Sequence, residues 1–348
     1  MTTQARPSRA VVFAYHNVGV RCLKVLLDFA ERSRGTAQPF EVALVVTHAD
    51  NPNENIWFGN VAQVAREAGI EVISPADPHD PEVMTRLRAL APDFLFSFYY
   101  RLMLAPELLA LASRGAFNMH GSLLPKYRGR VPVNWAVLHG ENEAGATLHA
   151  MVAKPDKGAI VDQMAVPILC DDSAQDVFEK VTMAAEIVLH RCLPALLAGE
   201  ANLHEQDQSQ ASYFGGRKAE DGRVPLAHTA RQVHNLVRAV APPYPGAFID
   251  LGEPGVLRIY RSRILHVIEP GGPALGIRDP AQLRDNAGLP VRGAGPMLVL
   301  RCGDGGLLQV LHAGLSPRGG EEQAINAHNA LTLLHCAPQT EFPLGVNP

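Results

Sequence analysis

The segment AVVFAYHNVGVRCLKVLLDFAERSRGTAQPFEVALVVT (residues 10–47) sets the fold class of this 348-residue chain. Residues 10–15 form a short apolar run, residues 20–32 carry apolar side chains at helical spacing after Gly19, and residues 41–47 form a second apolar run. Two short apolar runs separated by a helix of this length predict a strand–helix–strand unit, in which the two strands lie parallel.

The same alternation continues along the chain. We predict helices over 55–69 and 80–93 and in the long apolar segment that ends at Gly199, with Asp172 or Ser173 as the N-cap of the last. Further strands are predicted at 94–100, 115–120, 146–153 and 159–168. The pattern is that of an α/β domain around a largely parallel sheet, whose ligand sites lie at the carboxyl ends of its strands.

The character of the sequence changes after residue 205. A polar segment, 206–222, is expected to be a linker, and residues 229–240 have helical spacing. Short apolar runs punctuated by proline and glycine then predict a smaller β-barrel-like domain over 223–320, followed by a tail over 321–348.

The overall composition excludes several classes of protein. The chain is 47% hydrophobic and 19% charged, with a net charge of −4, so it has no general attraction for nucleic acid or anionic lipid. No apolar run approaches the roughly 20 residues of a membrane span, and the first nine residues lack the apolar part of a secretory signal. The five cysteines form no CxxC pair. We therefore expect a cytoplasmic protein with reduced thiols and no membrane insertion, and leave a homo-oligomer open.

Two kinds of cofactor are also not expected. The strand at 10–15 is followed by HNVGV, which has one glycine where a dinucleotide-binding turn needs G-x-G-x-x-G, so we expect no NAD or FAD bound in that manner. The 14 histidines include no HExxH pattern or clustered pair, so we expect no metal.

The segment FNMHGSLLPKYRGR (117–130) carries the strongest chemical signal. Side chains at i and i+2 of a strand share a face, so Asn118 and His120 would point the same way at a strand's carboxyl end. Asn118 could cap a loop while His120 binds a carbonyl. The alternative is an amide donor beside a general acid/base, as acyl transfer requires. A carboxylate that orients the imidazole could be Asp156, Asp162 or Asp171, and the residues alone do not choose among them.

FNMHGSLLPKYRGRVPVNW together with KPDKGAIVDQ resembles the signature of the 10-formyltetrahydrofolate-dependent formyltransferases. The similarity runs over most of residues 10–315. It implies a Rossmann-like N-terminal formyltransferase domain over 8–205 and a C-terminal OB-like β-barrel domain over 223–320. It also implies 10-formyltetrahydrofolate as cosubstrate.

Residue by residue, the resemblance implies His120 as catalytic acid/base, Asn118 as stabiliser of the oxyanion, and Asp156 as the group that orients His120 and raises its pKa. The implied folate pocket comprises Leu102, Met103, Leu104, Arg130, Val152, Ala153, Lys154, Pro155 and Asp156. For Lys126 and Arg128, a solvated basic loop and a binding role both remain open.

Within the family the chain most resembles the enzymes that formylate UDP-4-amino-4-deoxy-L-arabinose in lipid A modification and polymyxin resistance. The resemblance therefore implies a UDP-sugar or a related amino-sugar nucleotide as acceptor, without nucleic acid as a partner. These relatives commonly carry a fused decarboxylase domain, for which we expect no room in 348 residues. The alternative is a methionyl-tRNA formyltransferase, which shares the motifs and the second domain.

Overall fold

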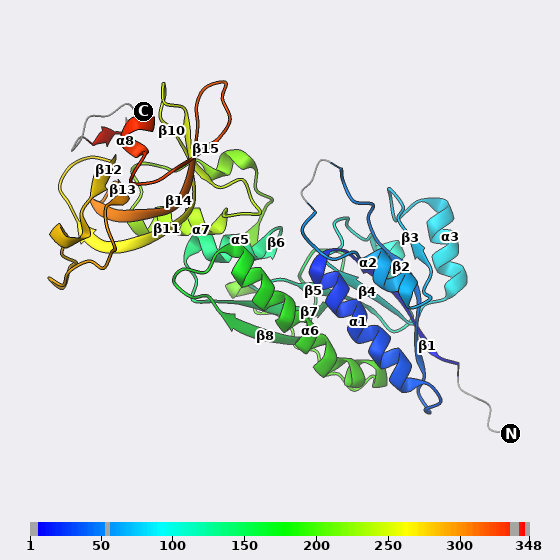
Figure 1. The fold of residues 1–348 in the computed structure, drawn as a ribbon. Helices are drawn as coiled ribbons and strands as arrows, with labels where there is room; N and C mark the ends of the chain where they lie inside the picture. The colour runs from blue at the N-terminus through cyan, green and yellow to red at the C-terminus, as the bar shows by residue number, and fades with distance from the viewer. Residues whose placement is uncertain (1–5, 53–55, 335–340, 345–348) are drawn as a thin grey trace. The chain divides into compact units, whose positions relative to one another are not determined.

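The computed structural model describes residues 6–52, 56–334 and 341–344. The chain divides into two compact units (Figure 1). Unit 1 comprises Met1–Val133, Glu143–Pro167 and Val177–Gly216, and unit 2 comprises Asn134–Asn142, Ile168–Asp176 and Arg217–Pro348. The boundaries inferred from the sequence, at residues 205, 222 and 320, stay predictions. In the proposed tail 321–348, residues 335–340 and 345–348 lie outside the described residues.

A seven-stranded sheet forms the centre of unit 1, in the order β3-β2-β1-β4-β5-β7-β8. Strands β1 to β5 pair in parallel, and β7 and β8 are antiparallel additions at one edge. The predicted Rossmann-like, largely parallel sheet is thus confirmed. The strands are β1 (Ser8–Ala14), β2 (Phe40–Val46), β3 (Val72–Ile73), β4 (Phe94–Phe98), β5 (Ala116–His120), β7 (Glu143–Ala150) and β8 (Ile160–Pro167).

Helices cover both faces of this sheet (Figure 1). An ion pair between Arg21 and Glu186 joins α1 to α6. The opposite face packs Met84 of α3 and Leu108 of α4 against alternate β1 side chains such as Phe13. The helices up to this point in the chain are α1 (His16–Ser33), α2 (Val61–Glu67), α3 (Pro81–Leu90), α4 (Pro106–Leu109), α5 (Pro132–His139) and α6 (Ala174–Ala198).

Several predicted element boundaries were wrong, including those of the strand at 146–153, which is Glu143–Ala150, and of the helix at 80–93, which is Pro81–Leu90. Three others have a local cause in the backbone. Helix α1 begins at His16, before Gly19, because His16 adopts φ 65° and turns the chain directly from β1 into the helix. Helix α2 begins only at Val61, where the Asn60 side chain accepts a hydrogen bond from the Gln63 N–H; Asn55, the predicted start, lies outside the described residues. Strand β4 ends at Phe98, since Tyr99 has φ 57°.

Ser173, not Asp172, caps helix α6. The Ser173 Oγ accepts a hydrogen bond from the Asp176 N–H at 3.2 Å, whereas the Asp172 carboxylate accepts one from Leu169 N–H. Among the described residues, α6 is the one helix long and apolar enough to cross a membrane. Its side chains Val177, Val181, Val188 and Leu189 are buried within the protein, as in the core helix of a folded domain.

An antiparallel sheet forms unit 2, in the order β10-β11-β14-β13-β12-β16, with β15 paired to β14. It curls into a half-barrel, which confirms the expected second, β-rich domain. The apolar face of α7, including Val233, Leu236 and Val237, packs into its core. The elements are α7 (Ala230–Ala239), β10 (Ala247–Asp250), β11 (Val256–Ile268), β12 (Ala274–Arg278), β13 (Met297–Arg301), β14 (Gly306–Ser316), β15 (Gln323–Ile325), α8 (Ala330–Leu333) and β16 (Phe342–Pro343).

Candidate active site

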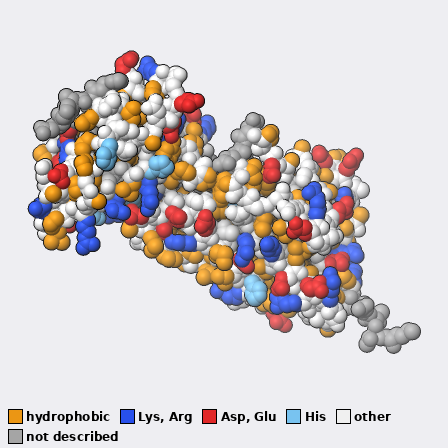
Figure 2. Space-filling model, viewed as in Figure 1, with side chains coloured by type: hydrophobic (Ala, Val, Ile, Leu, Met, Phe, Trp, Pro, Cys, Tyr) orange, Lys and Arg blue, Asp and Glu red, His pale blue; other side chains and the backbone are white. Residues whose placement is uncertain are grey.

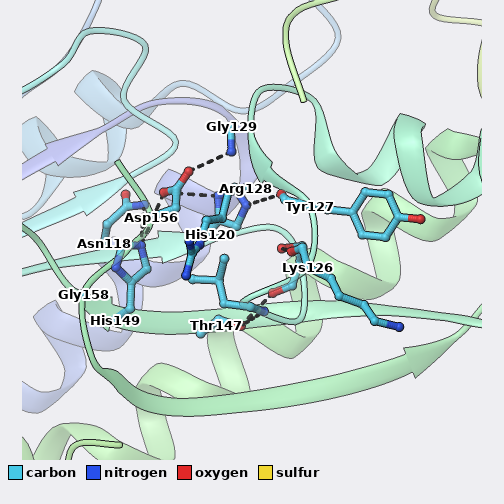
Figure 3. A network of polar contacts seen from close by, with 12 residues as sticks. Asn118, His120, Lys126, Tyr127, Arg128, Gly129, Thr147, His149, Asp156 and Gly158 are labelled. Atoms are coloured by element: carbon cyan, nitrogen blue, oxygen red, sulfur yellow. Dashed lines mark hydrogen bonds and ion pairs between the residues drawn. The ribbon is translucent and has the colours of Figure 1, made fainter. Parts of the chain in front are cut away.

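The paired strands β5 and β7 bring four polar side chains onto one face of the sheet. Asn118 lies opposite His149, and His120 lies opposite Thr147, in the antiparallel register. Side chains of directly opposed residues share a face and lie close together. The predicted common face of Asn118 and His120 is therefore extended by two residues from a strand that is distant in sequence (Figure 3).

The loop after β5 is held against this face. The Thr147 hydroxyl donates to the Ser122 carbonyl at 2.6 Å and accepts from the Leu124 N–H at 3.2 Å. Gly121 starts the turn where a Cβ would lie 2.0 Å from the Tyr99 hydroxyl oxygen, so a side chain there would require the Tyr99 ring to move. The loop then returns to His120 through the backbone of Tyr127.

His120 is a buried imidazole with its two nitrogens in different surroundings. Its Nε2 lies 2.8 Å from the Tyr127 carbonyl oxygen, which can only accept, so Nε2 carries the proton in the neutral ring. Its Nδ1 then holds a lone pair and lies 3.6 Å from Asp156 Oδ1. The Tyr127 carbonyl thus makes the hydrogen bond that orients the ring, and Asp156 lies beside the nitrogen that can take up a proton.

Asp156 is fixed in the loop between β7 and β8. Its Oδ2 accepts a hydrogen bond from the Gly129 N–H at 2.9 Å, and its Oδ1 lies 3.5 Å from His149 Nε2. The side chain is only 11% exposed. Asp156 adopts φ 55°, an uncommon conformation for a residue with a Cβ that recurs at functional sites. Its carboxylate therefore lies between two histidines and a backbone donor.

A buried polar bridge supports the two loops that meet here. The Gln206 side-chain amide donates to the carbonyls of Asp156 and Gly158 at 2.8 and 2.7 Å. Its carbonyl oxygen accepts from Arg128 Nη2 at 2.6 Å. Arg128 is buried, and its Nη1 donates a further hydrogen bond to the side-chain oxygen of Gln208. Of the two residues left open from the sequence, Arg128 therefore links loops, while Lys126 is exposed.

The electrostatics favour a neutral His120 beside an ionised Asp156. Burial lowers the pKa of His120, and the Asp156 carboxylate acts in the opposite direction. Burial alone would raise the pKa of Asp156, but His120 and the Gly129 N–H hold it well below its usual range. The predicted influence of Asp156 on the His120 pKa has the expected sign, but burial outweighs it.

Asn118 is positioned by His149. The His149 Nδ1 donates to the Ala150 carbonyl at 2.8 Å, which leaves Nε2 as an acceptor. Asn118 Nδ2 lies 3.2 Å from this Nε2 and donates to it. The bond sets which way round the amide lies and leaves the second N–H of the amide for another acceptor. Sequence reasoning missed His149, although it stands two residues after Thr147 in a predicted alternating strand.

The residues proposed for the folate pocket lie on two loops and beside the site. Leu104 is buried in the core cluster that contains Phe13, and Met151 packs against the same cluster. The loop after β4 and the loop after β7 therefore both start from this cluster. Leu102, Met103 and Val152 are 40%, 59% and 47% exposed, an uncommon state for large apolar side chains. Ala153, Lys154 and Arg130 are exposed, and Pro155 and Asp156 are partly buried. In the part of the chain that the structure describes, no three His, Cys, Asp or Glu side chains are grouped to hold a metal ion.

Two family models match this chain. The model described as "Formyl transferase" matches residues 13–193, and the model described as "Formyl transferase, C-terminal domain" matches residues 217–322. The first match alone covers more than half of the 348 residues and includes Asn118, His120, His149 and Asp156.

Solved structures share the fold at low sequence identity. The N-formyltransferase from Helicobacter canadensis, in complex with folinic acid and dTDP-3-aminofucose, is 19% identical with a TM-score of 0.64, over 88% of this chain and 99% of that one. WlaRD, a sugar 3N-formyl transferase with dTDP and 5-N-formyl-THF, is 17% identical with a TM-score of 0.65, over 92% and 99%. HypX from Aquifex aeolicus, in complex with tetrahydrofolic acid, is 15% identical with a TM-score of 0.55, over 93% of this chain and 46% of that one.

Proposed function

Because this chain belongs to the formyl transferase family, we propose that it moves the formyl group of 10-formyltetrahydrofolate to the amine of a sugar nucleotide. One observation carries the proposal. Asp156 Oδ1 lies 3.6 Å from His120 and 3.5 Å from His149, and His149 holds Asn118 (Figure 3). A proton acceptor, its counter-ion and an oriented amide donor thus meet in one buried site.

The chemistry assigned to these residues follows from their atoms. 10-Formyltetrahydrofolate supplies the formyl group as cosubstrate. Asn118 has one N–H held by His149 and offers the other to the oxyanion that develops when an amine attacks a formyl carbon. His120 accepts the amine's proton at Nδ1, and the adjacent Asp156 stabilises the imidazolium formed. His120 then returns the proton to the leaving nitrogen.

The folate pocket proposed from the sequence is compatible with the structure. A pterin ring is planar with apolar faces, and Leu102, Met103 and Val152 offer exposed apolar surface on the two loops that flank the site. Arg130 is exposed on the loop that follows Gly129, where a cation suits the carboxylates of a folate tail. We keep all nine pocket residues as a proposal.

A sugar nucleotide is preferred to tRNA as acceptor. Residues 207–348 hold 13 Lys and Arg against 12 Asp and Glu, so they lack the net positive charge typical of an RNA-binding domain. On the face shown in Figure 2, acidic and basic side chains are interspersed without a large area of one sign. The solved structures with nucleotide sugars or dTDP share the fold over most of this chain.

We propose UDP-4-amino-4-deoxy-L-arabinose as the first acceptor to test, on the strength of the HGSLLPKYRGRVPVNW motif. That acceptor would place the reaction in the cytoplasmic steps of lipid A modification and polymyxin resistance. The dTDP-linked 3-amino sugars form the second group of acceptors.

The test is a direct comparison of acceptors. Purified protein is mixed with 10-formyltetrahydrofolate and either UDP-4-amino-4-deoxy-L-arabinose, dTDP-linked 3-amino sugars or methionyl initiator tRNA, and formylated products are identified by mass spectrometry. We expect formylation of at least one amino-sugar nucleotide, at a rate about 10²–10³-fold lower with the Asn118→Ala enzyme. Rapid formylation of the tRNA, with none of any sugar, would replace this proposal with the methionyl-tRNA formyltransferase.

A further inference from the structure

A cavity lies wholly within unit 2 and is lined by none of the candidate catalytic residues. Its volume is about 390 Å³, within the range of small-molecule sites. It is lined by helix α7, by β11 and by the segments 140–142 and 168–171, which all belong to the same compact unit. Three arginines, Arg231, Arg238 and Arg263, contribute to its wall.

Helix α7 turns an unusual face to this cavity. Arg231, His234, Asn235 and Arg238 follow the i, i+3, i+4, i+7 spacing of one helix face, and all four line the cavity. The polar face of a surface helix normally meets solvent. Here His234, Asn235 and Arg238 are only 4%, 6% and 8% exposed. The helix therefore places a guanidinium and an imidazole in a largely enclosed wall.

The guanidinium of Arg238 is buried, and the carboxylates of Asp172 and Asp171 act on its charge only from beyond ion-pair distance. Its Nε donates to Asn235 Oδ1 at 3.0 Å, and its Nη1 donates to the carbonyls of Leu169 and Asp172 at 3.4 and 3.2 Å. Within the described ranges, Nη2 donates no hydrogen bond and no carboxylate lies within 4.0 Å of the group. A buried charge is costly unless it is paired, so an anion at Nη2 would stabilise this arrangement.

The side chains of the other two arginines of the wall also lack an ion-pair partner among the described residues. Arg231 and Arg263 are exposed, and neither side chain makes a hydrogen bond or ion pair with any residue the structure describes. The acidic lining residues are Glu141 and Asp171, and Asp171 lies 3.6 Å from His234. Three guanidiniums against two carboxylates leave the wall with a positive surplus.

A purely structural role explains part of this set. Arg238 and His234 connect α7 to the segment 168–172: His234 Nε2 donates to the Cys170 carbonyl at 3.0 Å, and its Nδ1 lies 3.0 Å from Ser262 Oγ. These contacts account for both His234 nitrogens and for two of the three Arg238 nitrogens. They leave the Arg238 Nη2, the two exposed arginines and the volume of the cavity unexplained.

We propose that this cavity binds a phosphate-bearing small molecule, with its phosphate on Arg231, Arg238 and Arg263. A phosphate group offers several charged acceptor oxygens, and the planar fork of arginine matches their geometry. Ile168, Leu169 and Ile264 line the same cavity and provide apolar contact for the rest of the ligand. The site is additional to the one that contains His120.

Cys170 provides a local reporter for this binding. It lines the cavity and is the exposed one among the free cysteines that the structure describes, Cys22, Cys170, Cys192 and Cys302. The rate of its alkylation by iodoacetamide, read on its own peptide by mass spectrometry, is measured with inorganic phosphate, pyrophosphate or UDP. At ten times its dissociation constant, a ligand that covers Cys170 should slow the reaction about tenfold. Ligand bound at His120 alone leaves this readout unchanged.

Matched variants locate the binding. Arg231→Gln with Arg263→Gln should weaken the ligand by about tenfold for each guanidinium removed, since hydrogen bonds to charged groups are worth roughly 1.5–3 kcal/mol. Arg261 is an exposed residue of β11 that does not line the cavity. Arg261→Gln removes the same charge and should leave the protection of Cys170 by ligand unchanged. Protection by pyrophosphate alone identifies the phosphate group as sufficient, and protection by UDP alone adds a requirement for the nucleoside. The proposal fails if no probe slows alkylation, if the double variant keeps full protection, or if Arg261→Gln loses as much.

Discussion

At the scale of single residues, the site depends on which nitrogen of His120 is free. The Tyr127 carbonyl occupies Nε2, so Nδ1 is the atom that can exchange a proton, and Asp156 lies 3.6 Å from it. In the proposed mechanism Asn118, held by His149, supplies the oxyanion donor. The roles of these residues are therefore separable by substitution.

Replacing His120 by alanine should reduce kcat by about 10²–10⁴-fold, the usual loss when a general acid/base is removed. Asn118→Ala should lose about 10²–10³-fold, as for an oxyanion donor. His190→Ala, a change at an exposed histidine of α6, is the control and should keep normal kinetics. Circular dichroism confirms that each variant is folded, and a folded His120→Ala enzyme with normal kcat would contradict the mechanism.

Replacing Asp156 by asparagine should change the pH profile as well as the rate. The carboxylate favours the imidazolium of His120, so its removal lowers the His120 pKa further. Activity that needs the neutral ring is lost as pH falls, so the acid limb of the kcat/KM profile should move to lower pH.

Asp162→Asn is the matched control for this change. Asp162 was an alternative from the sequence, but its carboxylate pairs with Arg191 at 2.7 Å, away from the two histidines. Its profile should stay that of the unmodified enzyme. Equal shifts in both variants, or no shift in Asp156→Asn, would remove Asp156 from the proton transfer.

At the scale of elements, the loop between β7 and β8 is held by a close backbone approach. A Cβ on Gly158 would lie 1.8 Å from the Ala150 carbonyl oxygen. Gly158→Ala should therefore displace the loop that carries Asp156 and lower the free energy of unfolding by about 1–3 kcal/mol. A displacement of about 1 Å at the site should cost roughly 10²-fold in kcat.

Gly215→Ala separates this effect from a general cost of replacing glycine. A Cβ on Gly215 has no heavy atom within 4 Å, and its φ is outside the left-handed region. Thermal unfolding and kcat are measured for both variants. Equal behaviour of the two would show that the approach to Ala150 does not position Asp156.

At the scale of the whole molecule, buried histidines make stability depend on pH. Burial lowers the pKa of His120 and His234. Burial, with a smaller contribution from the positive charge of Arg101, lowers the pKa of His16 to about 4. The unfolded chain, with an ordinary histidine pKa near 6.5, then binds more protons than the folded one. Stability is full above about pH 6.5 and falls below it, by about 1.4 kcal/mol per pH unit for each such histidine.

Thermal unfolding measured from pH 8 to pH 5 checks this expectation. The melting temperature should stay level down to about pH 6.5 and then decline. His190→Ala should decline in the same way, because that histidine is exposed. A melting temperature that stays constant to pH 5 would show that these imidazoles are not buried in their neutral form.

The sequence by itself determined the features that depend on local periodicity. Apolar runs separated by helical segments predicted the largely parallel sheet. Asn118 and His120 stand two positions apart, so the sequence also predicted that they share one face of β5. Element ends were less predictable, because single backbone conformations such as φ 65° at His16 and φ 57° at Tyr99 decide them.

Only the tertiary structure decided which distant residues complete the site. Asp156 is enclosed between two histidines, whereas Asp162 pairs with Arg191 and Asp171 is 48% exposed beside His234. His149 reaches Asn118 through the register of β5 with β7, and Gln206 joins the two loops across a long stretch of chain. Strand periodicity acts over neighbouring residues and can be read from them. Cross-strand register and loop closure depend on contacts between segments far apart, which local spacing does not specify.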